Sequence, residues 1–563
     1  VNKYNTYTIA WYDGAESSAS VSKNESYTYM WDNTLNYVNT WKKHSLVGLV
    51  GFSIEKYESD GLKASGSGFP DDQVLTNLNS AAKKNSISSS YSSNTLASFL
   101  SRLEYKFNNR YLLTLNFRAD GSSQFGPDKR WGYFPSGAVA WIITEENFMK
   151  DYSNIVSYLK LRGSVGKTGS QNLGAYDWRT LMGSATYNGA AGIVPSSLGN
   201  DILQWEEQIQ KEVGLDYGFW DDRIRGTLGY YQKKVDNLLY SDPVPTSSSF
   251  SSVYQNIGSL KNRGIEFDVR VDIIKNVQKD LTWNVDFNIA RNRTTLEKLN
   301  SSDGYFGGGA YDYFKIEEGG ETGRFYGYKD AGRLFMTNEE LVGLKTIDPK
   351  TGTLKYYRDD YNYERQGDVY IMDLDGDGQI TADGDRTVIG NANPDFFGGF
   401  GSTLYWKGLM LNAVFSYSVG GDRFWDEEKN SSGDMNVYNT SNRILDSWTV
   451  NPGVNASYPR AMYYGWGSNS IITDRYIHDA SYLRMTALNL SYRLPKHLYK
   501  NSILNAVEFT FQATNLFTWT KYPGMDPQGN FSTTYSAFYN MGIDYSTYPS
   551  ARTYNFGIKL TLK

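Results

Sequence analysis

The chain has 563 residues, with 0 Cys, 3 His and 46 Tyr, and aromatic residues make up 15% of it. The missing cysteines exclude disulfide bonds, thiolate catalysis and cysteine-ligated metal or iron–sulfur sites. A formal net charge of −5 argues against a nucleic-acid-binding protein. No apolar run approaches the ~18–20 residues of a membrane-spanning helix, which excludes helical membrane proteins. Membrane proteins that cross the bilayer with β-strands are not excluded, because only every second residue of such a strand faces lipid.

The dominant pattern along the chain is alternation of apolar and polar residues, which predicts β-strands with one apolar face. In one such ladder, Ile265 and Phe267 alternate with Glu266 and Asp268. We expect about fifteen or sixteen strands, each near the ~9–11 residues that cross a bilayer at a tilt. In chain order the ladders lie near 27–38, 43–56, 99–107, 110–119, 132–144, 155–165, 208–219, 222–234, 263–272, 283–289, 396–406, 408–420, 481–494, 507–514 and 554–562.

The connections between these ladders are of two kinds. Short polar turns are expected at 107–110, 220–223 and 406–408. Long loops are expected near 57–96, 236–258, 294–395, 421–476 and 515–550. Tight turns on one rim and long loops on the other are typical of outer-membrane barrels, whose long loops face outside the cell. A propeller would instead show an internal repeat of about 40–50 residues, and we find none.

Alternation alone does not decide which face of the strands meets water. A barrel of roughly sixteen strands encloses a lumen too wide for side chains to fill, so its apolar face must point to lipid. Aromatic residues at strand ends fit the girdles found at membrane interfaces, although they could also simply mark strands. They are Trp31, Trp41, Trp131, Trp141, Trp205, Trp220, Tyr405, Trp406 and Trp519. The predicted fold is therefore all-β, a transmembrane antiparallel β-barrel.

Several stretches, in order and spacing, resemble the SusC/RagA-like TonB-dependent transporters of the Bacteroidetes outer membrane. They are RADGSSQFG (118–126), RWGYFPS (130–136), LKLRGSVG (159–166) with TGSQ (168–171), GLDYGF (214–219), NIGSLKNRGIEF (256–267), NPDF (393–396), DASYLR (479–484), and ATNLFTW (513–519) with the following DP (526–527). This resemblance implies a bacterial outer-membrane location. It also implies a barrel of about twenty-two strands. Residues 1–563 would form its C-terminal portion, with the plug domain and TonB box not in this chain. We therefore expect that the chain does not close a barrel alone, because unpaired strand edges are costly in lipid.

The function implied by the resemblance is nutrient import without bond chemistry, so we expect no enzyme. The barrel would take up oligosaccharides or oligopeptides, with a SusD-like surface lipoprotein as its lid and TonB acting through the plug. An alternative is a SusC-like barrel that serves as a structural or scaffold subunit of a larger outer-membrane complex without transport. The three histidines, His44, His478 and His497, are far apart in sequence and suggest no catalytic or metal-binding motif.

One acidic segment resembles the first half of an EF-hand calcium loop. Asp373, Asp375 and Asp377 occupy positions 1, 3 and 5, Gly378 occupies position 6, and Gln379 would offer its backbone carbonyl. Position 12, normally a bidentate glutamate, is a glycine, and the neighbouring Asp383 and Asp385 could supply ligands instead. The segment thus predicts a structural Ca²⁺ site. The alternative is an acidic surface turn that binds no ion tightly. No other cofactor is expected.

Aromatic and glycine-rich stretches in two of the long loops could contact cargo or a partner. Aromatic faces beside polar groups suit sugars and peptides, because they combine stacking with hydrogen bonds. The alternative, slightly favoured, is that these rings pack against a lid protein or against each other. The residues concerned are Tyr305, Tyr311, Tyr313, Tyr464 and Trp466.

Overall fold

The computed structural model describes residues 17–70, 77–276, 278–299, 305–307, 313–337, 346–347, 354–355, 366–433, 440–450, 452–453, 456–461, 469, 471–500, 503–529, 541–545 and 547–562. The chain divides into two compact units. Unit 1 comprises residues 1–141, 163–211 and 234–259, and unit 2 comprises residues 142–162, 212–233 and 260–563. Among the described residues, no helix is both long and apolar enough to cross a lipid bilayer.

Fifteen strands form the main sheet, in the order β1-β2-β3-β4-β5-β6-β9-β10-β13-β14-β23-β24-β27-β28-β30. Neighbours pair antiparallel from β1 to β5 in unit 1 and from β14 to β30 in unit 2. The number of strands agrees with the sequence prediction. Their bounds are β1 Ser18–Trp41, β2 His44–Ser67, β3 Lys83–Phe107, β4 Tyr111–Ser122, β5 Trp131–Ile142, β6 Val156–Ser170, β9 Glu206–Phe219, β10 Ile224–Asp236, β13 Ser259–Asn276, β14 Leu281–Lys298, β23 Phe396–Trp406, β24 Leu409–Val419, β27 Tyr482–Arg493, β28 Leu504–Thr520 and β30 Thr553–Leu562. That the chain does not close a barrel alone stays a prediction.

Strands β1, β2 and β3 are much longer than expected, with 24, 24 and 25 residues. The loop predicted at 57–96 is therefore wrong, because β2 continues to Ser67 and β3 already begins at Lys83. Ladder hydrogen bonds continue through the serine- and asparagine-rich segment 83–94 although its alternation is lost. Alternation requires an apolar environment on one face, so strand residues that meet water on both faces do not show it.

The other expected long connections are close to their predicted positions. They run from 237 to 258, 299 to 395, 420 to 481 and 521 to 552. A further long connection, from 171 to 205, was not predicted, and it contains the hairpin of β7 (Met182–Tyr187) and β8 (Ala190–Pro195).

The predicted short turns are confirmed. Asn108 and Asn109 link β3 to β4 with φ of 51° and 55°, and Lys407 and Gly408 link β23 to β24 with φ of 48° and 87°. Positive φ at both central residues gives the turn a twist that matches the strands, and asparagine and glycine adopt it at low cost. The turn at 220–222, between β9 and β10, likewise has positive φ at all three residues.

The apolar face of the strands is left exposed. On β30, Tyr554, Phe556 and Ile558 are 56%, 81% and 66% exposed, and on β4 Leu115 and Phe117 are exposed as well. These residues alternate with polar ones, so they belong to one face of each strand. An apolar surface of this extent is stable against lipid hydrocarbon and unfavourable in water.

The opposite face carries hydrogen-bonded polar side chains. Asn412 on β24 donates from Nδ2 to Thr403 Oγ1 on β23 at 2.9 Å, and Asn489 on β27 donates to Asn412 Oδ1 at 2.9 Å. Two strands of unit 1 are linked similarly, since Arg118 on β4 donates to Ser98 Oγ on β3 at 2.8 Å. A polar face of this kind is suited to a water-filled lumen.

The predicted aromatic girdle is only partly supported. The predicted residues that are exposed on strands of the main sheet are Trp31, Trp41, Trp131, Tyr405, Trp406 and Trp519. Trp205, in contrast, is 6% exposed and packs with Phe125, Phe134 and Leu203 in a small core of unit 1. It lies just before β9, where a connection folds back and covers it.

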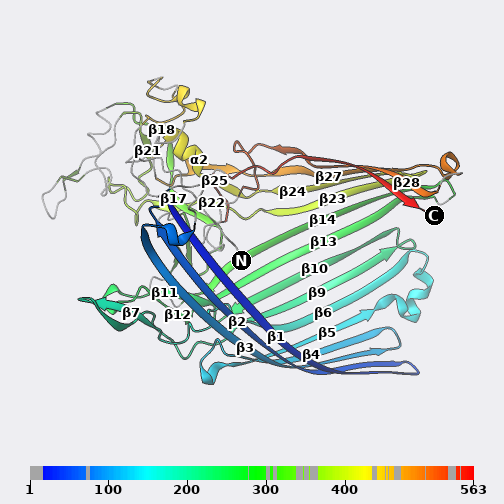
Figure 1. Ribbon diagram of the computed structural model, residues 1–563. Helices are drawn as coiled ribbons and strands as arrows, with labels where there is room; N and C mark the ends of the chain where they lie inside the picture. Colours follow the sequence, from blue (N-terminus) through cyan, green and yellow to red (C-terminus); the bar gives the residue numbers. More distant parts are fainter. Residues whose placement is uncertain are drawn as a thin grey trace. The chain divides into compact units, whose positions relative to one another are not determined.

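Small strands and the one-turn helix α2 gather at one end of the unit 2 strands (Figure 1). Their bounds are β15 Tyr305–Gly307, β16 Lys315–Glu317, β17 Arg324–Tyr328, β18 Asp330–Leu334, β19 Thr346–Ile347, β20 Leu354–Lys355, β21 Val369–Ile371, β22 Arg386–Asn391, β25 Asp422–Trp425, α2 Asp426–Glu428, β26 Ile477–Asp479 and β29 Ile543–Asp544. In unit 1, β11 (Leu239–Pro243) pairs with β12 (Ser252–Asn256).

Three long connections of unit 2 share one hydrophobic core. Phe325 comes from the connection 299–395, Phe424 and Tyr476 from 420–481, and Ile543 from 521–552, and all four are at most 4% exposed. Burying aromatic rings of this size is strongly stabilising, so these connections form a folded layer and not separate loops.

Candidate functional site

The folded layer of unit 2 is held together by buried carboxylates, and Glu428 in α2 is one centre. Arg443 Nη1 and Tyr458 OH donate to Glu428 Oε1 at 2.9 and 3.1 Å, and His478 Nε2 lies 2.6 Å from Oε2. Burial and the nearby Glu428 charge raise the pKa of Tyr458, so its hydroxyl stays a donor. Sequence reasoning missed the carboxylate partner of His478, because 50 residues separate the two.

Asp426, also in α2, joins two of the long connections. Tyr313 OH donates to its Oδ1 at 2.6 Å, Asn430 Nδ2 donates to its Oδ2 at 2.6 Å, and Lys429 Nζ lies 3.3 Å from Oδ1. The carboxylate is 1% exposed, and these partners compensate its lost hydration.

Arg484 on β27 attaches the third connection to the main sheet. Its Nη2 and Nη1 donate to Asp526 Oδ1 at 2.6 Å and to Gln528 Oε1 at 2.5 Å, and its Nε donates to Thr518 Oγ1 at 2.9 Å. Burial would raise the pKa of Asp526, but the hydrogen bond and charge of Arg484, together with the backbone N–H groups of Gln528 and Ser550, outweigh it, and the pKa is lowered.

A second arginine–carboxylate pair links the connections 299–395 and 420–481. Arg460 donates from Nε and Nη2 to the two oxygens of Asp368, both at 3.0 Å, and Asn469 Nδ2 donates to Asp368 Oδ1 at 2.7 Å. The two-pronged geometry fixes the orientation as well as the distance. These pairs give the folded layer of unit 2 a defined shape. A surface that recognises a ligand or a partner needs such a shape.

The acidic segment forms a compact loop. One ligand oxygen from each of Asp373, Asp375 and Asp377 lies within 4.8 Å of the others, which is compatible with a single cation. Gly378 has φ of +83°, a left-handed conformation that glycine adopts at low cost. Ile380, 1% exposed, anchors the loop in a core with Leu334, Phe335, Val369 and Ile371.

Asp383 and Asp385, which could have supplied further ligands, both lie outside the cluster of three aspartates. Asp385 is fully buried, and its oxygens accept the backbone N–H groups of Leu374 and Thr381, both at 2.7 Å, so it closes the loop. Asp383 is exposed. A Cβ on Gly384, at position 12, would clash with Asp375 Oδ2, so the aspartate occupies the space of the usual glutamate. Gln379 is buried beside them. Ca²⁺ binding stays a prediction.

Of the aromatic residues predicted to contact cargo or a partner, Tyr313 is the one whose surroundings are defined. It is 5% exposed, and its ring packs edge-on against Phe424 with centroids 4.9 Å apart. It therefore takes part in loop packing, the alternative that the sequence slightly favoured. Tyr305 lies in β15, paired with Glu317. Tyr311, Tyr464 and Trp466 lie outside the described residues.

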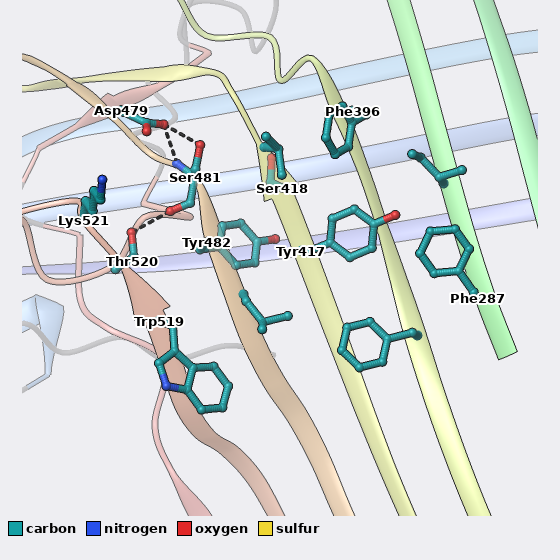
Figure 2. A pocket seen from close by; sticks show the side chains of 14 residues that line it. Phe287, Phe396, Tyr417, Ser418, Asp479, Ser481, Tyr482, Trp519, Thr520 and Lys521 are labelled. Carbon is teal, nitrogen blue, oxygen red and sulfur yellow. Dashed lines mark hydrogen bonds between the residues drawn. The ribbon is translucent and has the colours of Figure 1, made fainter. Parts of the chain in front are cut away.

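The structure also shows a groove that sequence reasoning missed (Figure 2). It has a volume of about 790 Å³ and lies where β14, β23, β24, β27 and β28 approach the long connections. Its walls include Phe287, Phe400, Tyr417 and Trp519. Their common face follows from cross-strand register, which alternation in single strands could not supply.

Comparison with known proteins agrees with this architecture. Residues 1–516 match the family model for the TonB dependent receptor-like β-barrel. TonB-dependent receptor P3 of Formosa agariphila is 32% identical over 583 residues, and the alignment covers 100% of this chain and 55% of that protein. TonB-dependent receptor SusC of Bacteroides thetaiotaomicron is 32% identical over 483 residues, covering 83% of this chain and 44% of SusC.

Solved structures give the same result. The RagAB peptide transporter superimposes with a TM-score of 0.79 at 27% identity, covering 98% of this chain and 57% of that one. The chain thus spans about half the length of the relatives that it matches. Those relatives are receptors and transporters by name. The family match, the exposed apolar strand face and the likeness to SusC and RagAB together lead to one conclusion: this chain belongs to the TonB-dependent receptor-like β-barrel family, is SusC/RagA-like, and is a transmembrane β-barrel protein of the outer membrane.

Proposed function

We propose that this chain supplies barrel wall and the long-loop end of an outer-membrane nutrient importer. The observation that carries the proposal is the folded layer of unit 2, in which three long connections share one core. Ion pairs join the connections 299–395 and 420–481, and another attaches the connection 521–552 to β27. A layer with a fixed shape, built on strands with a polar face, suits the capture of solutes at the entrance of a lumen.

The proposed cargo is an oligosaccharide or an oligopeptide. The likeness to the RagAB structures, named as a peptide transporter and a peptide importer, supports the peptide class. The likeness to SusC and RagAB also supports a SusD-like surface lipoprotein as the lid, and the family supports energy input from TonB through a plug. Import itself would break no covalent bond.

The test uses the full-length protein extracted from outer membranes in detergent. We expect a surface lipoprotein to co-purify, which mass spectrometry would identify. We also expect calorimetry with defined oligopeptide and oligosaccharide mixtures to show binding of one class. Deletion of the gene should slow growth on that class alone, and growth on free amino acids and monosaccharides is the control.

A different result would favour the scaffold alternative. If neither mixture binds and growth is unchanged on both, while other outer-membrane proteins lose their assembly in the deletion strain, import is wrong.

A further inference from the structure

The groove of Figure 2 lies on the apolar face of the main sheet. Cross-strand register pairs Phe287 with Phe400, Phe400 with Phe415, Tyr417 with Leu483, and Leu483 with Trp519. Directly paired residues point to the same side of a sheet. The groove walls therefore share the face that carries the exposed residues of β30, and this face meets lipid in an outer-membrane barrel.

Six of the fourteen residues that line the groove are aromatic. Phe287 and Tyr417 stack with centroids 6.1 Å apart and an interplanar angle of 12°, and Phe396 meets Tyr417 edge-on at 6.4 Å. Trp519, about half exposed, stands at the other side of the groove (Figure 2). The volume of about 790 Å³ lies within the usual range of small-molecule sites. An apolar groove that opens into hydrocarbon suits an acyl chain.

One end of the groove is polar, and it is the end that adjoins the long connections. Val419 ends β24, Tyr482 begins β27 and Thr520 ends β28. Here Asp479 Oδ1 accepts hydrogen bonds from Ser481 N–H at 2.8 Å and from Ser481 Oγ at 2.5 Å. Thr520 Oγ1 donates to the Ser481 carbonyl at 2.7 Å. These groups partner one another and hold the strand ends together (Figure 2).

Lys521 differs from its polar neighbours. Its side chain is exposed, and among the described residues it has no carboxylate partner. The other charged residue of the lining, Asp479, is already engaged by Ser481. A cation at the membrane–water interface, beside an apolar groove, is complementary to a lipid whose headgroup carries a phosphate.

We propose that this groove binds one lipid molecule of the leaflet on the long-loop side, with an acyl chain against the aromatic wall and its phosphate group facing Lys521. This inference depends on the outer-membrane location and not on the proposed import. It assigns a specific site to a surface that other lipids contact only transiently. A bound lipid would also brace the strand ends that carry the folded layer.

The test uses full-length protein reconstituted in phosphatidylcholine bilayers and probed with lipids that carry bromine on their acyl chains. Bromine quenches nearby tryptophan fluorescence, and the Trp519 contribution is the difference between wild type and Trp519→Phe. We expect brominated phosphatidic acid to quench this contribution at a lower mole fraction than brominated phosphatidylcholine. Loss of one interfacial cation in Lys521→Gln should weaken that preference about fivefold. Lys521→Arg should keep it.

Two matched controls separate the site from the general lipid surface. Lys407 is an exposed lysine at the short-turn end, 5.7 Å from the Trp406 ring, and Lys407→Gln should change nothing. Val419→Phe should fill the groove and reduce quenching, whereas Leu411→Phe, on the same face of β24 but outside the groove, should not. Equal quenching by both lipids in wild type, or unchanged quenching in Val419→Phe, would overturn the proposal.

Discussion

Arg484 and Asp526 are 42 residues apart in the chain, yet Nη2 of the first donates to Oδ1 of the second at 2.6 Å, and both are at most 6% exposed. Each residue belongs to a stretch by which the sequence resembles SusC/RagA-like transporters. The pair attaches the connection 521–552 to β27 of the main sheet. Two of the motifs that carry the resemblance, 479–484 and 526–527, therefore meet in one contact between β27 and the connection 521–552.

Removing one partner of this contact should be costly. Arg484→Ala leaves the Asp526 carboxylate buried without its cation, and breaking a buried pair in this way costs about 3–5 kcal/mol. Thermal unfolding in detergent should show a lower Tm, and hydrogen exchange should show faster opening of residues 521–529. Glu317→Gln is a matched control, because Glu317 pairs with Lys315 at 2.6 Å but is 62% exposed. It should cost at most about 1 kcal/mol. Similar losses for both variants would contradict this prediction.

The same contact should respond to acid. Because the folded-state pKa of Asp526 is lowered, its stabilising contribution is complete above the unfolded pKa of about 3.9. That contribution is lost as the pH falls through the lower, folded-state pKa. Stability measured by denaturant titration in detergent between pH 6 and pH 3 should therefore decline less steeply in Asp526→Asn than in wild type. Parallel pH profiles would show that Asp526 does not titrate as inferred.

The acidic loop should bind Ca²⁺ weakly. Three exposed or half-exposed carboxylates without a position-12 glutamate resemble low-affinity sites, for which we expect a Kd of about 10⁻⁴–10⁻³ M by calorimetry. Asp377→Asn should lower the affinity, and Asp383→Asn, outside the cluster, should not. Gly384→Ala should also weaken binding, since its Cβ would displace Asp375. Absence of Ca²⁺-dependent heat in the wild-type protein would leave the loop as an acidic turn.

The two faces of β30 should tolerate charge differently. Phe556 is exposed on the apolar face, and an arginine there costs about 2–4 kcal/mol if it lies near the bilayer midplane. Asn555, its neighbour on the opposite face, should accept arginine with little loss. The measurement is the fraction of protein that reaches a heat-modifiable, folded state in the outer membrane. Equal yields for Phe556→Arg and Asn555→Arg would mean that the face assignment is wrong.

The alternation of apolar and polar residues explains which parts of the fold could be predicted from the sequence. Inside the bilayer, lipid on one side and polar surroundings on the other impose alternation, so strands such as β13 and β30 are visible in the sequence. Beyond the bilayer that constraint disappears. The prediction therefore shortened β2 and β3 and placed a loop at 57–96, where the ladder in fact continues to Ser67 and resumes at Lys83.

The candidate sites were less predictable, and for a related reason. The Asp373–Asp377 cluster is local, so its spacing revealed it, but burial of Asp385 depends on the loop closing over it. The Glu428–His478 contact and the groove of Figure 2 join residues from distant segments. No pattern within one segment records such contacts.

By itself, the amino-acid sequence determined the all-β class, the number of strands, the short turns and the resemblance to SusC/RagA-like transporters, because these depend on neighbours along the chain. Only the tertiary structure decided that three long connections share one core, that Trp205 and Tyr313 are buried, and that the apolar faces of neighbouring strands form a groove beside Lys521. Side-chain packing and cross-strand register are set by residues far apart in sequence, and the free energy of burial acts on those contacts together.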